Sequence, residues 1–106
     1  MDAFTQGYIA ALYFTEDTDT PLSAATQELI LAHCATFQAN NRDALAMYYK
    51  SGATPTQAGH DFWLTRNAHG AGFWDRGLGR LGDNLTDAAA AWGGFHLYEH
   101  NGELHA

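Results

Sequence analysis

The sequence has too few cysteines for an internal disulfide and no apolar stretch long enough to anchor it in a membrane. Its one cysteine, Cys34, leaves no second thiol for an internal disulfide and is expected to be a small buried residue. No apolar stretch approaches the ~20 residues that span a bilayer. The first residues lack the basic and apolar segments of a signal peptide. These absences predict a protein of a reducing, intracellular compartment without membrane contact.

Basic residues are also scarce. Five Lys and Arg stand against twelve Asp and Glu, which gives a net charge of −7. Residues 1–49 hold six acids and one base, residues 50–82 hold two acids and four bases, and residues 83–106 hold four acids and no base. Because phosphate binding needs an excess of positive charge, direct binding to nucleic acid or anionic lipid is not expected.

Apolar side chains are abundant by comparison. Hydrophobic residues make up 46% of the chain and aromatic residues 13%, while charged residues reach only 16%. A disordered chain has the opposite balance. We therefore expect residues 1–106 to form a single domain around one core rich in Phe, Tyr and Trp.

Start signals and apolar spacing predict five helical segments. The clearest starts are Thr20-Pro21 and Thr54-Pro55, where a threonine N-cap precedes a proline at the first helical position. Asp83 is expected to cap the last helix and Gly93-Gly94 to end it. The predicted helices cover about residues 4–15, 21–40, 43–50, 55–66 and 84–92. Within the first, YIAALYF (residues 8–14) could instead be a buried strand, and the third is either separate from the second or its bent continuation.

The end of the chain predicts a β-hairpin. Two alternating segments flank Asn101-Gly102, the pair most typical of a two-residue hairpin turn, and this register places His100 opposite Glu103. The face with Leu104 should pack on helices, and the other should be open to solvent or bound to a partner. GAGFWD, residues 70–75, is expected to add one strand. The predicted fold class is α+β: helix-rich, with a short antiparallel sheet.

The most distinctive stretch is HDFWLTRNAHGAGFWDRG, residues 60–77. Its His60, Asp61 and His69 are candidates for metal binding or acid-base chemistry, although they lack zinc-ligand spacing and no nucleophile is evident. The alternative is structural. In that interpretation three aromatic residues form core, and charged residues pair at its edge. The aromatic residues are Phe62, Phe73 and Trp92, and the charged ones are Asp61, Arg66, Asp75 and Arg76.

Other short motifs are weaker. GLGRLG, residues 77–82, matches a dinucleotide-binding glycine pattern, but the chain ends in a hairpin where a second parallel strand is required. His96 and His100 lie four strand residues apart, ~13 Å, which is too far for one metal ion. We therefore assign no catalytic residue, no metal ligand and no cofactor.

HDFWLTRNAHGAGFWDRG, followed by LGDNLTDAAAAWGGFHLY and a hairpin, resembles a family of small uncharacterised proteins encoded by tailed bacteriophages and prophages. The resemblance covers about residues 54–102, with Ala68 standing where a glycine is expected. It implies a phage or prophage origin and a single small domain. It implies no catalytic residues.

An acidic phage protein of this size suggests a non-enzymatic inhibitor of a bacterial defence complex, such as an anti-CRISPR or anti-restriction protein. It would act in the host bacterial cytoplasm by occupying a nucleic-acid-binding surface of a host protein or nucleoprotein complex. The candidate partner-binding residues are Glu16, Asp17, Asp19, Glu28, Asp83, Asp87, Glu99 and Glu103. The alternatives are a small enzyme centred on His60, Asp61 and His69, or a phage assembly accessory protein.

Overall fold

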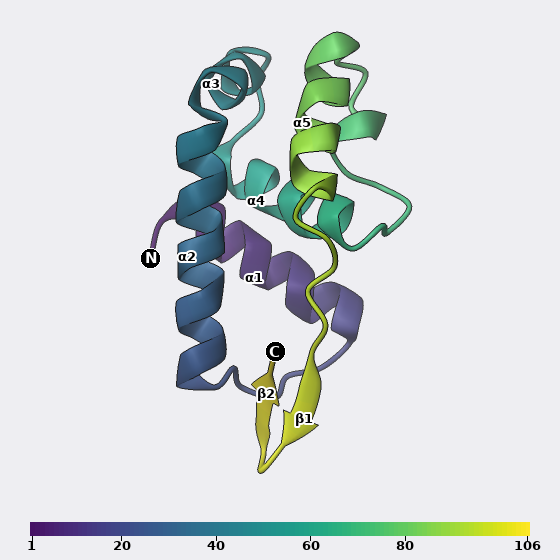
Figure 1. The fold of residues 1–106 in the computed structure, drawn as a ribbon. Coiled ribbons are helices and arrows are strands. Elements are labelled where there is room, and N and C mark those ends of the chain that lie inside the picture. The colour runs from purple at the N-terminus through teal and green to yellow at the C-terminus, as the bar shows by residue number, and fades with distance from the viewer.

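The computed structural model describes all 106 residues of the chain. They form five α-helices, one 3-10 helix and a two-stranded antiparallel sheet, which confirms the predicted α+β class. The hairpin extends from one end of a helical body (Figure 1). In chain order the elements are α1 Ala3–Glu16, α2 Ala24–Asn40, α3 Arg42–Lys50, α4 Pro55–Arg66, η1 Phe73–Asp75, α5 Arg80–Ala90, β1 Tyr98–His100 and β2 Glu103–His105.

The centre of the fold is the contact between α1 and α4, which pack more extensively than any other two elements. Two glycines allow the helices to touch backbone to backbone. A Cβ atom at Gly59 would lie 1.9 Å from the carbonyl oxygen of Phe4, and one at Gly7 would lie 2.0 Å from that of Thr56. Any side chain at either position would therefore force the two helices apart.

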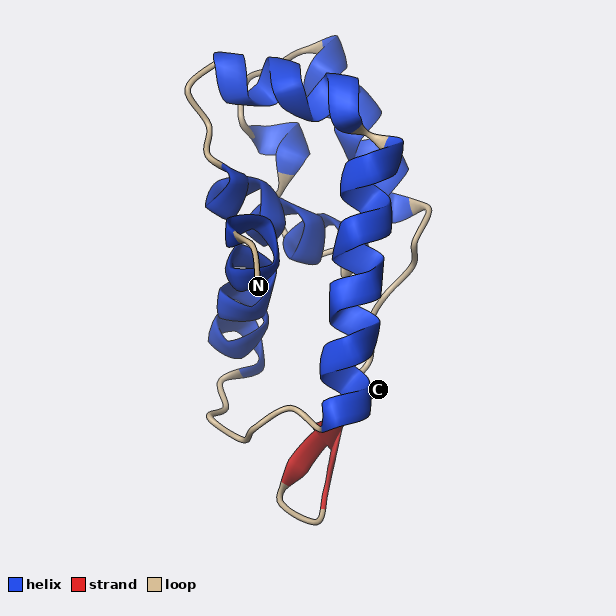
Figure 2. Ribbon diagram, turned by 90° about the vertical axis from the view of Figure 1, so that its left-hand side faces the viewer, coloured by secondary structure: helices blue, strands red, loops and turns tan.

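Aromatic side chains fill the space between these helices and α2. The Phe37 ring stacks on the Phe62 ring with centroids 4.1 Å apart. Phe4 packs on both rings, and Phe73 lies beyond Phe37. These residues belong to one core of 17 buried hydrophobic residues. α2 runs along one side of the molecule, with the hairpin just beyond its beginning (Figure 2).

The predicted start of the second helix is three residues too early. Ser23, not Thr20, is the N-cap of α2, and its side chain accepts a hydrogen bond from the Thr26 backbone N–H. The segment before it is extended because it pairs with β2. The Leu104 N–H donates to the Pro21 carbonyl at 2.8 Å, and the Ser23 N–H donates to the Leu104 carbonyl at 3.0 Å.

The predicted strand at residues 70–75 is wrong, because part of this segment is the 3-10 helix η1. Local and tertiary hydrogen bonds compete with strand pairing here. The Gly72 N–H donates to the Asp75 carboxylate at 3.1 Å, and the Phe73 N–H donates to the Thr65 hydroxyl at 3.2 Å. The hairpin gains one bridge to Leu22 from the segment before α2.

The other helix and strand boundaries agree with those predicted from the sequence, with one exception. α5 begins at Arg80, so Asp83 lies in its first turn and does not cap it. α4 begins as predicted, because the Thr54 hydroxyl accepts from the Gln57 N–H. The hairpin has the predicted register, with His100 opposite Glu103 and Leu104 buried. No helix combines the length and apolar character that a membrane span requires.

Candidate functional site

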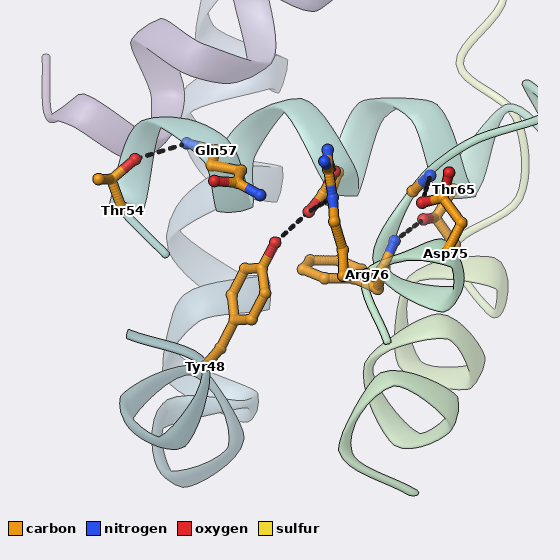
Figure 3. Close-up of polar contacts among 9 residues, drawn as sticks. Tyr48, Thr54, Gln57, Thr65, Asp75 and Arg76 are labelled. Carbon is orange, nitrogen blue, oxygen red and sulfur yellow. Dashed lines mark hydrogen bonds and ion pairs between the residues drawn. The ribbon is translucent and has the colours of Figure 1, made fainter. Parts of the chain in front are cut away.

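Two charged residues of the 60–77 motif, Asp61 and Arg76, form an ion pair around a buried carboxylate. Arg76 donates to both oxygens of Asp61, from Nη2 to Oδ1 at 2.8 Å and from Nε to Oδ2 at 3.3 Å. The Tyr48 hydroxyl also donates to Asp61 Oδ2. Figure 3 shows Tyr48 reaching from α3, and Arg76 from the segment after η1, toward α4. The carboxylate therefore joins three segments.

Burial and charge act together in this group. Asp61 is fully buried, whereas the Arg76 side chain keeps 37% of its surface exposed. The hydrogen bond from Arg76 to Asp61 raises the pKa of the guanidinium. Burial and the hydrogen bond to Asp61 raise the pKa of the Tyr48 phenol. Tyr48 therefore keeps its proton and is no candidate for a nucleophile at neutral pH.

A second cation of the motif, Arg66, is buried and has no carboxylate partner. Its Nε donates to the Gly93 carbonyl at 2.9 Å, and its Nη1 lies 3.2 Å from the Tyr8 hydroxyl and 3.1 Å from His33 Nδ1. Three aromatic rings surround the guanidinium at 5.2–5.5 Å: Phe62, Trp92 and Phe95. Cation-π contacts and hydrogen bonds replace the ion pair expected for this residue.

The structural interpretation of the motif is thus correct for Asp61 and Arg76 and wrong for Arg66 and Asp75, which pair with no opposite charge. Phe62 and Phe73 are buried core residues, as predicted, and Trp92 packs against that core. Trp63 is buried as well, and its indole N–H donates to Thr15 at 2.8 Å. Trp74 remains 53% exposed.

The three residues of the enzyme alternative do not share a site. The Asp61 carboxylate accepts hydrogen bonds from Tyr48 and Arg76. His60 lines an apolar groove between α1 and α4, and the His69 ring stacks on Trp63 at 6.4 Å. No group of three or more His, Cys, Asp or Glu side chains is placed to hold a metal ion. His60, Asp61 and His69 therefore each have different neighbours.

His33 and Cys34 are neighbours in sequence but face different surroundings. Cys34 is fully buried, as predicted, and burial raises the pKa of its thiol to about 12. His33 instead meets Arg66, and both burial and that positive charge lower the pKa of its imidazole. A thiol with so high a pKa is a poor nucleophile, so this pair offers no thiolate chemistry.

The eight candidate acids divide between two regions. All are exposed. Asp83 and Asp87 lie on α5, at the far end of the molecule from the hairpin (Figure 1). The other six lie on the hairpin, around the α1–α2 connection and on the first turns of α2. We call these six the acidic end: Glu16, Asp17, Asp19, Glu28, Glu99 and Glu103.

The bases are absent from that end. α1, α2, their connection and the hairpin contain no Lys or Arg. The exposed bases lie on α3, in the segment after η1 and at the start of α5, on a molecule with a longest extent of 43 Å (Figure 1). These exposed bases are Arg42, Lys50, Arg76 and Arg80. The sequence did not predict this separation along the molecule.

An apolar groove between α1 and α4 was also missed by sequence reasoning. It measures about 580 Å³, and His60 is its one titratable residue. In the helix predicted at residues 4–15, the apolar spacing does not place Phe14 on the core face. A large aromatic side chain outside the predicted core was the one sequence signal for this groove. Phe14 is 86% exposed at the rim of the groove. The groove is lined by Ala10, Ala11, Phe14, Thr15, His60, Leu64 and Ala71.

No protein-family model matches the chain, and neither the search of curated proteins nor that of solved structures finds a match. No residue role can therefore be transferred from a relative.

Proposed function

We propose that this protein is a non-enzymatic binding protein whose acidic end docks on a basic surface of a host bacterial protein or nucleoprotein complex. The observation that carries the proposal is the separation of charge. Six exposed carboxylates lie on elements that contain no Lys or Arg, and none of the six forms an ion pair. Carboxylates without internal partners remain free to meet external cations.

The sharpest form of the proposal is inhibition of a bacterial defence complex of the CRISPR or restriction type. The phage or prophage origin proposed for the chain would give it a host target of this kind. A surface that normally binds nucleic acid is basic, and a rigid array of carboxylates can occupy it in place of phosphates. The protein itself would contact no nucleic acid and need no cofactor.

Affinity capture from bacterial lysate tests this proposal with a matched pair of variants. The first neutralises five members of the acidic end (Glu16→Gln, Asp17→Asn, Asp19→Asn, Glu99→Gln, Glu103→Gln). The second neutralises Asp83 and Asp87 on α5. Wild type and the α5 variant should retain the same partner, and the acidic-end variant should lose it.

Salt dependence provides the second measurement. Because exposed charges are screened within ~10 Å at 0.1 M salt, affinity for the captured partner should fall steeply as salt is raised. A host strain with active CRISPR immunity should also lose protection against a targeted phage when it expresses the wild-type protein. Flat affinity across salt, or full capture by the acidic-end variant, would overturn the charge mechanism.

A further inference from the structure

The apolar groove between α1 and α4 is a consequence of small residues on α1. Gly7 and Gly59 hold the helices in backbone contact near the beginning of α1. Further along, Ala10 and Ala11 leave a hollow opposite His60 and Leu64. The Thr15 hydroxyl in this wall already accepts from Trp63 and donates to the Ala11 carbonyl at 3.0 Å. The wall therefore offers an almost entirely apolar surface.

A second, acidic hollow adjoins the groove, because the Phe14 side chain lines both. This hollow measures about 530 Å³ and contains Asp17 and Asp19. The Tyr13 hydroxyl donates to the Thr20 carbonyl at 2.9 Å, which holds the connection that carries the two carboxylates. α1 also ends here, with no basic residue in its last turn. The terminal carbonyls of the helix thus add partial negative charge.

We propose that the groove and the acidic hollow together bind a basic amphipathic segment of the partner. This inference rests on the proposed function and names the chemistry of the segment that would be recognised. An apolar side chain fills the groove beside Phe14, and a neighbouring Lys or Arg lies over Asp17 and Asp19. A helix that presents apolar anchors on one face and cations beside them combines these two features.

The charges near the groove select this occupant. An anionic lipid or acidic peptide would be repelled by Asp17, Asp19 and the carboxyl end of α1. A purely apolar ligand would leave the acidic hollow unused. Volumes of ~300–1,000 Å³ are typical of pockets that enclose small ligands, so the groove can admit one or two large apolar side chains.

Fluorescence anisotropy with a synthetic probe tests the proposal. The probe is a fluorescein-labelled peptide of leucine and lysine spaced as an amphipathic helix, and the control peptide replaces its lysines with glutamates. Ala10→Phe fills the groove from an exposed position, and Phe14→Ala removes the shared wall. Each should weaken lysine-peptide binding about tenfold or more, a loss typical of a contact at the centre of an interface.

Matched variants separate the groove from general charge attraction. Met47→Ala changes an exposed apolar side chain on α3 and should leave affinity unchanged. Asp17→Asn with Asp19→Asn should weaken binding, whereas Asp83→Asn with Asp87→Asn should not. Amide resonances of Ala10, Leu64 and Ala71 should shift when the lysine peptide is added.

Three results would overturn the proposal that the groove binds a basic amphipathic segment of the partner. One is that wild type and Ala10→Phe bind the lysine peptide with equal affinity, while only the double variant Glu99→Gln/Glu103→Gln binds it more weakly. That result would leave the acidic-end proposal standing. The second is no binding of the lysine peptide to wild type. The third is a dimer in sedimentation that Ala10→Phe abolishes, because a second copy would then be the occupant. The lysate capture described above tests the proposed function independently of all three.

Discussion

Asp61 and Arg76 form the only ion pair of the protein, and they join the two halves of one sequence motif. The carboxylate comes from the buried face of α4, and the guanidinium comes from the segment just after η1. The pair fixes the glycine-rich connection between them against the helix, with Tyr48 of α3 as a third member. A stretch that has the composition of an active site thus acts as a tertiary cross-link.

Removing Arg76 should be costly because it leaves a buried carboxylate without its cation. We expect Arg76→Ala to lower the free energy of unfolding by about 3 kcal/mol, near the lower limit for breaking a buried pair because Arg76 is partly exposed. Tyr48→Phe removes one hydrogen bond to the same carboxylate and should cost about 1.5–3 kcal/mol. Urea unfolding followed by tryptophan fluorescence measures both.

Arg80→Ala is the control for these variants, because Arg80 is exposed and unpaired. Its effect should stay within about 0.5 kcal/mol. If Arg76→Ala is as mild as Arg80→Ala, the ion pair does not hold the connection. A double variant of Tyr48 and Arg76 should cost less than the sum of the two single changes, because both contact Asp61.

Gly59→Ala should disrupt the contact between α1 and α4. The added methyl would lie 1.9 Å from the Phe4 carbonyl oxygen, and backbone cannot move aside as a side chain can. We expect a loss of about 3 kcal/mol or more, at the upper end for overpacking. Thermal unfolding followed by circular dichroism provides the measurement.

Gly70→Ala makes the matched comparison, because a Cβ there meets no atom within 4 Å. This variant should unfold close to the wild-type temperature. Equal melting of the two alanine variants would contradict the close helix contact. A higher unfolding temperature for Gly59→Ala than for wild type would contradict it as well.

The half-buried imidazole of His33 should make stability depend on pH. Burial and the Arg66 charge lower its pKa in the folded state, while the unfolded chain takes up the proton near the ordinary value of about 6.5. As pH falls below that value, the unfolded state binds more protons, so stability declines. The decline ends once pH has passed the lowered folded-state pKa.

His33→Gln removes this titration and keeps an acceptor for Arg66. Between pH 7 and pH 5, the free energy of unfolding should fall more for wild type than for His33→Gln. Denaturant unfolding at several pH values supplies the comparison. Parallel curves for the two proteins would show that His33 does not titrate differently on folding.

Several features followed directly from local sequence. Asn101-Gly102 predicted the hairpin and its register, and Thr54-Pro55 predicted the first turn of α4. Both depend on interactions between residues close in the chain. The Asp61–Arg76 pair was also within reach, because both residues belong to one short motif whose aromatic neighbours were expected to be core.

Other predictions failed where distant residues compete for the same backbone groups. Pro21 is sterically suited to begin a helix, but its carbonyl accepts a hydrogen bond from Leu104 at the other end of the chain. Residues 70–75 had the composition of a strand, but the Thr65 hydroxyl takes the Phe73 N–H. Arg66 was expected to meet a carboxylate and instead lies among three aromatic rings.

The sequence by itself determined the helix-rich α+β class, the hairpin and the overall excess of negative charge, because composition and local hydrogen bonding decide these. Only the tertiary structure decided where that charge lies. Pairing of β2 with Pro21–Ser23 brings the acidic connection after α1 to the hairpin, whereas α5 carries Asp83 and Asp87 away from it. The groove beside Phe14 is likewise tertiary, because its two walls come from helices separated by 38 residues of chain between Glu16 and Pro55.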